Sequence, residues 1–161
     1  MSGLKKLLQK KNFIRIPLRK LVTNHLELDA TINGVQGTFI LDTGASNSCV
    51  GIDMIEFFNL DAKESDTKAA GAGAIDMETQ QSEHNTLEIG KWKTKNFHLV
   101  LFDLTHVNTA LTQHKAAEVN GIIGADILEK GKAIIDYNKH ILYLRTSKKQ
   151  QYNCIFDLLK Q

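Results

Sequence analysis

One short segment of the sequence combines residue types that can perform chemistry. Asp42-Thr43-Gly44-Ala45-Ser46 follows directly on the apolar run Phe39-Ile40-Leu41. A buried strand that ends in this way presents a carboxylate at the point where the chain must turn. Thr43 adds a hydroxyl, Gly44 lets the backbone pass close to the carboxylate, and the small Ala45 leaves room for the backbone of a ligand. The segment is therefore a candidate catalytic loop with its aspartate as the reacting group.

An ordinary turn is the alternative interpretation, because Asp, Thr, Gly and Ser are all common turn residues. A second segment favours the catalytic interpretation. In Asn120–Leu128, two branched apolar residues meet Gly124, and a short polar step and a turn of helix follow. The carboxylate and the glycine lie far apart in the sequence, so they are useful together only if the fold brings the two segments into contact.

The two segments, in this order, resemble those of the retropepsin family of aspartic proteases. That family pairs an apolar-apolar-Asp-Thr/Ser-Gly-Ala loop with a later apolar-apolar-Gly segment, and the two cross to hold the catalytic loop. The resemblance covers about Leu26 to Leu144 and is fuller to the small cellular, bacterial-type members than to the viral enzymes. It implies a mainly β fold, a small closed barrel-like sheet with one or two short helices. It also implies an aspartic endopeptidase, with a peptide or protein as substrate.

The resemblance assigns expected roles residue by residue. Asp42 resembles the catalytic aspartate, Thr43 the residue whose hydroxyl bonds across to the partner loop, and Gly44 the residue whose amide helps to hold the carboxylates. Further support for the loop is expected from Ala45, Ile122, Ile123 and Gly124. A glycine-containing flap that closes over substrate is expected at Ala70, Gly71, Ala72, Gly73 and Ala74, although an idle flexible loop would have the same composition.

Two departures from the viral pattern bear on assembly. Viral members commonly have an acidic residue where Ser46 stands and an arginine where Ala125 stands, and these brace the dimer. Viral chains also end soon after the strand that matches Ile134–Tyr137, whereas this chain continues to Gln161. We therefore expect a dimer interface built differently from one of interdigitated termini.

A single candidate aspartate predicts two chains. Peptide hydrolysis by carboxylates needs one group to take a proton and another to give one. The sequence has one Asp-Thr-Gly, and Asp103, Asp126 and Asp136 lack the hydroxyl residue and glycine that follow it. A two-fold homodimer supplies the second Asp42. If the active species were a monomer, Asp126 would be the first suspect, but a helix-capping role is expected for it.

The elements that must position these residues are mostly strands. Alternating apolar and polar residues, interrupted by turn signals such as Asn33-Gly34, predict three hairpins: 26–32 with 35–41, 87–90 with 97–101, and 133–137 with 141–144. Helical spacing is found at 52–60 and 104–119, and one helical turn at 127–130 is stopped by Gly131. Trp92, beside the second turn, is expected to serve packing.

Composition limits the remaining possibilities. The chain of 161 residues fits one domain, 1–161, with its core at about 22–145 and a tail at 146–161 that docks on a partner in one interpretation. A net charge of +2 and the lack of a long apolar stretch favour neither a nucleic acid nor a membrane as partner. The two cysteines, Cys49 and Cys154, form no framework, so a reduced, cytoplasmic protein is expected.

Neither a metal nor another cofactor is expected. Of the six histidines, only His106 and His114 share a candidate helix, and their spacing is too wide for two ligands on adjacent turns. The main rival to an enzyme is a non-catalytic peptide-binding module that keeps the retropepsin fold. The intact Asp42-Thr43-Gly44 favours the enzyme, because a decayed enzyme would not need all three residues.

Overall fold

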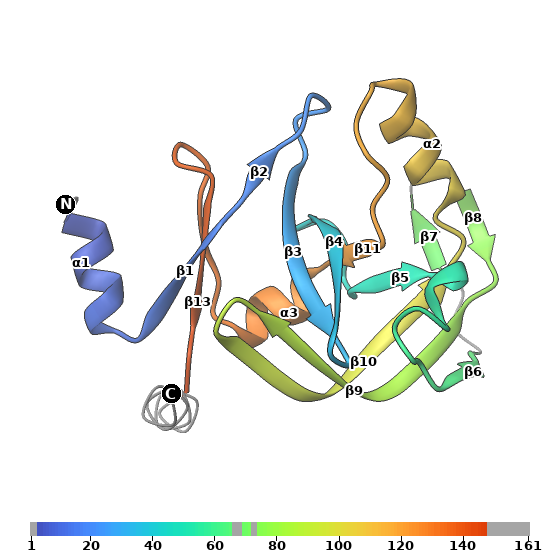
Figure 1. Ribbon diagram of the computed structural model, residues 1–161, viewed down its shortest axis with the longest axis horizontal. Coiled ribbons are helices and arrows are strands. Elements are labelled where there is room, and N and C mark those ends of the chain that lie inside the picture. Colours follow the sequence, from blue (N-terminus) through green and yellow to red (C-terminus); the bar gives the residue numbers. More distant parts are fainter. Residues whose placement is uncertain (1–2, 66–68, 72–73, 148–161) are drawn as a thin grey trace.

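A closed barrel of six strands lies at the centre of the structure, a computed structural model that describes residues 3–65, 69–71 and 74–147 (Figure 1). Around the barrel the strands are β3 (Leu26–Ile32), β4 (Val35–Leu41), β11 (Gly121–Ile123), β5 (Cys49–Gly51), β10 (Trp92–Phe102) and β9 (Gln80–Ile89). The pairing of β9 with β3 closes it. The short strands β2 (Arg19–Lys20) and β6 (Ala62–Glu64) pair with β3 and β9. The expected mainly β, closed barrel-like fold is confirmed.

Smaller elements flank this barrel. A three-stranded sheet has the order β1 (Phe13–Pro17), β13 (Ile141–Arg145) and β12 (Ile134–Asp136), and β7 (Ala69–Gly71) pairs with β8 (Ala74–Met77). The helices are α1 (Gly3–Lys10), α2 (Thr105–Gln113), α3 (Ala125–Lys130) and the 3-10 helix η1 (Ile52–Met54). In Figure 1, α1 and the three-stranded sheet lie on one side of the barrel and the β7–β8 hairpin lies on the other.

The three predicted hairpins are present. Asn33 and Gly34 have φ of 50° and 86°, the two positive values that a tight hairpin turn matching the strand twist requires. The second hairpin, β9–β10, turns at Gly90 and is longer than expected, because β9 begins at Gln80 in a polar stretch that shows no alternation. The third hairpin joins β12 to β13.

The predicted helices are shorter in the structure. The pattern at 104–119 predicts more than four turns, but α2 ends at Gln113, because Lys115 takes a φ of 61°. The chain then folds back, and the Asn108 side chain binds the backbone N–H and C=O of Val119 at 2.9 and 3.1 Å. At 52–60 only η1 forms, followed by turns that end at Asn59, with a φ of 52°.

Two N-terminal elements were not predicted. The strand β1 pairs along its whole length with β13, from Phe13 opposite Arg145 to Pro17 opposite Ile141. Helix α1 packs against this sheet through Leu8, which joins a small cluster with Ile141 and Tyr143. The first and last strands of the described chain therefore pair with each other within one protomer. The expectation of a differently built dimer interface stays a prediction.

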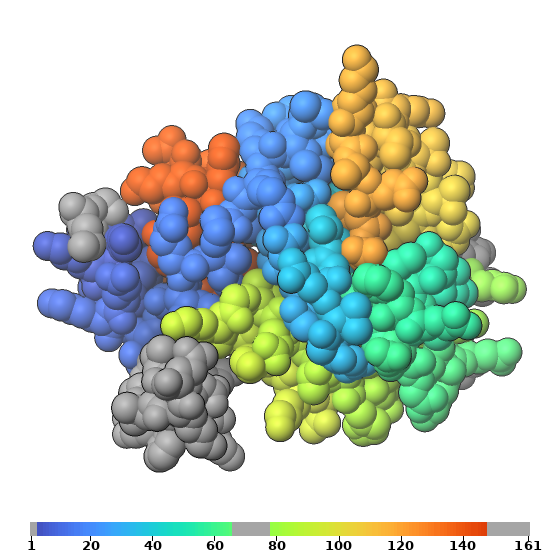
Figure 2. Space-filling view, viewed as in Figure 1, coloured from blue at the N-terminus to red at the C-terminus, as the bar shows by residue number. Residues whose placement is uncertain are grey.

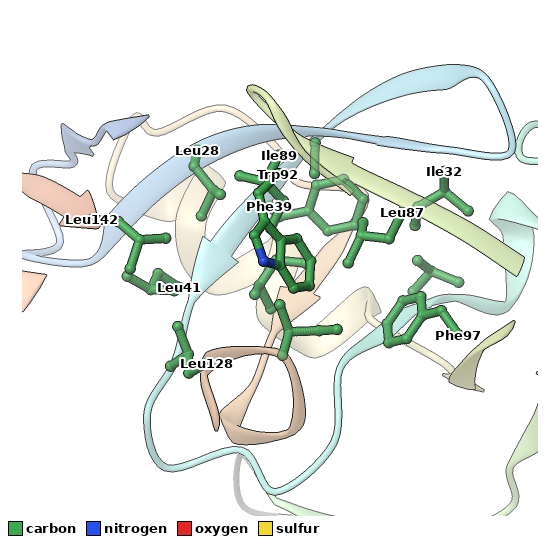
Figure 3. Packing of buried hydrophobic residues seen from close by; sticks show 14 of the residues in the cluster. Leu28, Ile32, Phe39, Leu41, Leu87, Ile89, Trp92, Phe97, Leu128 and Leu142 are labelled. Atoms are coloured by element: carbon green, nitrogen blue, oxygen red, sulfur yellow. The ribbon is translucent and has the colours of Figure 1, made fainter. Parts of the chain in front are cut away.

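The barrel interior is a single apolar cluster (Figure 3). Trp92, 3% exposed, lies within it, so its expected packing role is confirmed. A second cluster lies on the other face of β4 and β11 and joins them to the α2 region; its buried members are Ile40, Leu111 and Val119, and Leu21, Val107, Ala116 and Ile122 pack against them. The end of β4 is thus fixed from both faces.

Candidate active site

The strand β11 separates two strands that follow each other in the chain. It lies between β4 and β5, parallel to the first and antiparallel to the second. The connection 42–48, which we call the aspartate loop, must therefore pass round the end of β11. This topology brings the Asp-Thr-Gly segment against the predicted supporting segment, although the two are far apart in the sequence.

Gly124 lies where the aspartate loop crosses the end of β11. A Cβ atom built there would be 2.7 Å from the carbonyl oxygen of Ala45 and 2.8 Å from the backbone of Asn47. The φ of Gly124 is −103°, which any residue can adopt. The glycine is therefore required for the close approach of two backbones and not for an unusual conformation.

Backbone hydrogen bonds fasten the loop to the segment that follows β11. The N–H of Asp42 donates to the carbonyl of Ile123 at 3.0 Å, and the N–H of Ala125 donates to the carbonyl of Ala45 at 2.8 Å. A longer bond of 3.3 Å runs from the N–H of Asp126 to the carbonyl of Ser46. The loop is thus held along its length by backbone N–H and C=O groups, so these bonds do not depend on which side chains are present.

The carboxylate of Asp42 lies at the surface of the protomer. Asp42, Thr43 and Gly44 are all exposed, and the N–H of Gly44 donates to Oδ1 of Asp42 at 2.8 Å. Within the described residues of this chain, the Thr43 hydroxyl has no hydrogen-bond partner. The structure therefore places the predicted Asp42 and Gly44 in hydrogen-bond contact and leaves Thr43 exposed.

The two isoleucines of the supporting segment point in opposite directions. Ile123 is fully buried in the barrel interior, whereas Ile122 is half-buried and packs with Ile40 in the cluster that α2 covers. Ile40 lies near the end of β4, and Asp42 follows directly after that strand. An apolar wall made from β4, β11 and the α2 region thus lies at the end of the strand that leads into the aspartate loop; in Figure 2, residues of β2–β3 lie next to those that follow α2.

A buried thiol directly follows the aspartate loop in the chain. Cys49, in β5, is 3% exposed, and burial raises the pKa of its thiol to about 12. The negative charges of Asp126 and Asp42 contribute to the same shift. Both carboxylates therefore lie close enough to this thiol to affect its charge, and at neutral pH the thiol is protonated.

The expected capping role of Asp126 is wrong. The N-cap of α3 is Gly124, without a side-chain cap, and Oδ1 of Asp126 instead accepts hydrogen bonds from the N–H and the hydroxyl of Ser48, at 3.0 and 2.7 Å. Sequence reasoning did not identify Ser48 as a site residue. Its polar side chain at the start of a buried strand was the available signal, but nothing indicated a partner 78 residues away.

The predicted flap falls on a hairpin. Ala70 and Gly71 belong to β7 and Ala74 begins β8, with Gly71 opposite Ala74 and Ala69 opposite Met77. Ala72 and Gly73, the predicted tip, lie outside the described residues. The structure therefore supports a hairpin at this position, and the flap role remains a prediction.

In the described part of the chain, no three His, Cys, Asp or Glu side chains are grouped as a metal site would need. Across residues 3–65, 69–71 and 74–147, no helix has the length and apolar character needed to cross a membrane.

Comparison with known proteins gives consistent matches. A family model described as aspartyl protease matches residues 28–127. A retropepsin-like aspartic protease from Rickettsia conorii superimposes with a TM-score of 0.57 at 21% identity, covering 83% of this chain and 92% of that one. EIAV protease in complex with the inhibitor HBY-793 gives 0.54 at 19%, covering 71% and 95%. The retroviral protease-like domain of Ddi1 from Leishmania major gives 0.50 at 17%, covering 74% and 87%. No curated protein matches the sequence.

Proposed function

Because the chain belongs to the aspartyl protease family and has a retropepsin-like fold, we propose that it is an aspartic endopeptidase that acts as a homodimer. Each protomer contributes one Asp42 to a pair of carboxylates on the two-fold axis. The observation that carries the proposal is the exposed Asp42 carboxylate, presented on a loop whose backbone is fastened at Ile123 and Ala125.

The reaction follows from two adjacent carboxylates. Held close together, they share one proton, because two like charges at that distance cannot both ionise cheaply. The ionised carboxylate takes a proton from water as the water oxygen attacks the peptide carbonyl carbon, and the protonated one gives its proton to the carbonyl oxygen. The C–N bond then breaks as the leaving nitrogen takes the proton that the first carboxylate took from water. A hydroxyl of the tetrahedral intermediate gives its proton to the second carboxylate, which restores the shared proton of the pair. No step requires a metal or a cofactor.

Two features of the protomer support assembly in pairs. Asp42, Thr43 and Gly44 are exposed together, so a second aspartate loop can meet the first across a two-fold axis. Asp126, the other acid against the loop, has its Oδ1 engaged by two hydrogen bonds from Ser48, which suits a supporting role better than proton transfer. Thr43, which is exposed, is then available to bond through its hydroxyl to the partner loop.

The substrate in this proposal is an extended peptide. It lies between the carboxylate pair and the β7–β8 hairpin, which acts as the flap. The partly exposed Ile122, at the edge of the apolar wall, favours an apolar side chain next to the scissile bond. The free thiol of Cys49 is compatible with a reducing compartment, and the cytoplasm is the location we propose.

A peptide-library digestion analysed by mass spectrometry tests this function. Wild-type protein is expected to cleave internal peptide bonds, and Asp42→Asn to lose about 10²–10⁴-fold or more of that activity, because the variant keeps the shape but not the proton transfer. Asp61→Asn is the matched control, since Asp61 is an exposed aspartate in an exposed ion pair with Lys63. Undiminished cleavage by folded Asp42→Asn would reject the assigned role. Peptide binding without cleavage by the wild type would instead support the non-catalytic module.

A further inference from the structure

The hydroxyl of Ser48 joins the end of the aspartate loop to the segment that follows β11. Ser48 is fully buried, and its hydroxyl donates to Oδ1 of Asp126 at 2.7 Å while accepting from the N–H of Gly124 at 2.9 Å. Its N–H donates to the same Oδ1 at 3.0 Å. A buried hydroxyl is thus satisfied both as donor and as acceptor, which a folded interior demands.

These contacts differ from the other fastenings of the aspartate loop. The bonds at Asp42, Ala45 and Ser46 use backbone groups on both sides. Of the hydrogen bonds between the loop and the segment that follows β11, only those at Ser48, with Asp126 and with the N–H of Gly124, depend on particular side chains. They lie at the end of the loop opposite to Asp42. Within the described residues, they are the bonds between these two segments that truncation of a side chain removes.

The acceptor is a carboxylate, and it is half-buried. Hydrogen bonds to an ionised acceptor are roughly twice as strong as those between neutral groups. The carboxylate also makes no cap for α3, which begins at Gly124 without a side-chain bond. The Asp126 carboxylate thus binds Ser48 of the aspartate loop and not the N-terminal N–H groups of its own helix.

We infer that Asp126 is a positioning residue for the reaction, and that it acts through Ser48 to hold the aspartate loop in its reactive geometry. This inference rests on the proposed function. Preset geometry matters because a displacement of about 1 Å at a reacting group can cost about 10²-fold in rate. When Asp126 is lost, the loop keeps its backbone bonds but loses its anchor at Ser48, so Asp42 samples unproductive positions.

Kinetics of three variants on α3 test the inference. Asp126→Ala is expected to lower kcat about 10- to 100-fold with KM changed less than about threefold, since the loop and not the substrate pocket is altered. Asp126→Asn keeps an oxygen that can accept both bonds from Ser48, so it is expected to retain kcat within about fivefold of the wild type. Glu129→Ala, which removes an exposed carboxylate from the same helix, is the matched control and should leave both constants unchanged.

A double-variant comparison separates a shared contact from two independent ones. Ser48→Ala should also lower kcat. Combined with Asp126→Ala, it should lose clearly less than the product of the two single losses, because both changes break the same contact. Fully multiplicative losses, or equal loss in Asp126→Asn and Asp126→Ala, would overturn the inference. All constants are to be measured where circular dichroism shows each variant to be folded.

Amide hydrogen exchange supplies a readout that does not require activity. In Asp126→Ala the amides of the aspartate loop, including those of Asp42 and Gly44, should exchange at least about 10-fold faster, while those of β9 and β10 keep their protection. Unchanged exchange in the loop would overturn the positioning role. An inactive wild type whose loop is nevertheless loosened by Asp126→Ala would refute the proposed function and, with it, a role in catalysis, while leaving the anchor itself intact.

Discussion

Replacing Gly124 with alanine would place a methyl group inside the backbone of the aspartate loop. The new Cβ would lie 2.7 Å from the oxygen of Ala45 and 2.8 Å from the carbonyl carbon and oxygen of Asn47. Non-bonded carbon atoms prefer separations of about 3.5–4.0 Å. All three neighbours are backbone atoms, so no rotation of a side chain relieves the overlap, and the loop must move.

The magnitude follows from these contacts. Overpacking typically costs about 1–3 kcal/mol, and a clash with backbone on one side belongs at the upper end. If the loop moves away, the hydrogen bond between the N–H of Ala125 and the carbonyl of Ala45 is weakened as well. Its loss would lower the free energy of unfolding by up to about 0.5–1.5 kcal/mol more. We therefore expect Gly124→Ala to lower the free energy of unfolding by about 3 kcal/mol, a large part of a typical total of about 5–15 kcal/mol.

Urea unfolding followed by fluorescence measures this loss. Trp92 is the only tryptophan and is buried in the barrel, so its emission reports the global transition. In the folded Gly124→Ala protein, peptide cleavage should fall about 10²-fold, because the displaced loop carries Asp42. Gly3→Ala, where no atom lies within 4 Å of the added Cβ, is the control and should stay within about 0.5 kcal/mol of the wild type. An unchanged midpoint and unchanged cleavage in Gly124→Ala would refute the account of how the loop is supported.

Three further outcomes are expected. Phe58→Ala should lower the free energy of unfolding by about 3–5 kcal/mol, since the ring is fully buried; a urea midpoint like that of the wild type would contradict this. Hydrogen bonds from Arg19 hold the pKa of Asp29 below its usual value, so their stabilisation is present at neutral pH and is lost as the pH falls below the unfolded value of about 3.9. Asp29→Asn should therefore flatten the acid side of the stability profile, and a profile of unchanged slope would count against the pair. In a Cys154→Ser background, Cys49 should resist iodoacetamide at pH 8 until urea unfolds the chain, because burial raises the pKa of its thiol to about 12; rapid labelling of the folded protein would show that the site is open.

Local sequence signals predicted the hairpins well. Asn33-Gly34 specifies its turn by itself, because both residues accept positive φ, and the flanking alternation sets which face of each strand is buried. The same reasoning overestimated the helix that becomes α2, because Lys115 takes a positive φ without being glycine or asparagine. The helical spacing of apolar residues continues past that point, but the helical conformation of the backbone ends.

Elements that depend on distant partners were not predictable in this way. Helix α1 has only eight residues, too few to be stable alone, and it depends on the packing of Leu8 against Tyr143. Its partner strand β1 pairs with β13 near the other end of the described chain. At the site, motif resemblance indicated Asp42 and Gly124, but the contact between Ser48 and Asp126 needed the fold to become visible.

The central claim is that two Asp42 carboxylates act as one unit, and a mixing experiment tests it most directly. Wild-type and Asp42→Asn chains are unfolded together and refolded at constant total concentration, above the dissociation constant of the dimer, and peptide cleavage is measured against the wild-type fraction. If each active unit needs two intact chains, random pairing leaves about one quarter of the activity in an equal mixture, because mixed dimers have a single ionisable aspartate. Mixtures with the control Asp61→Asn should keep full activity. Activity that falls only in proportion to the wild-type fraction, to about one half in the equal mixture, would show that each chain works alone and would contradict the account.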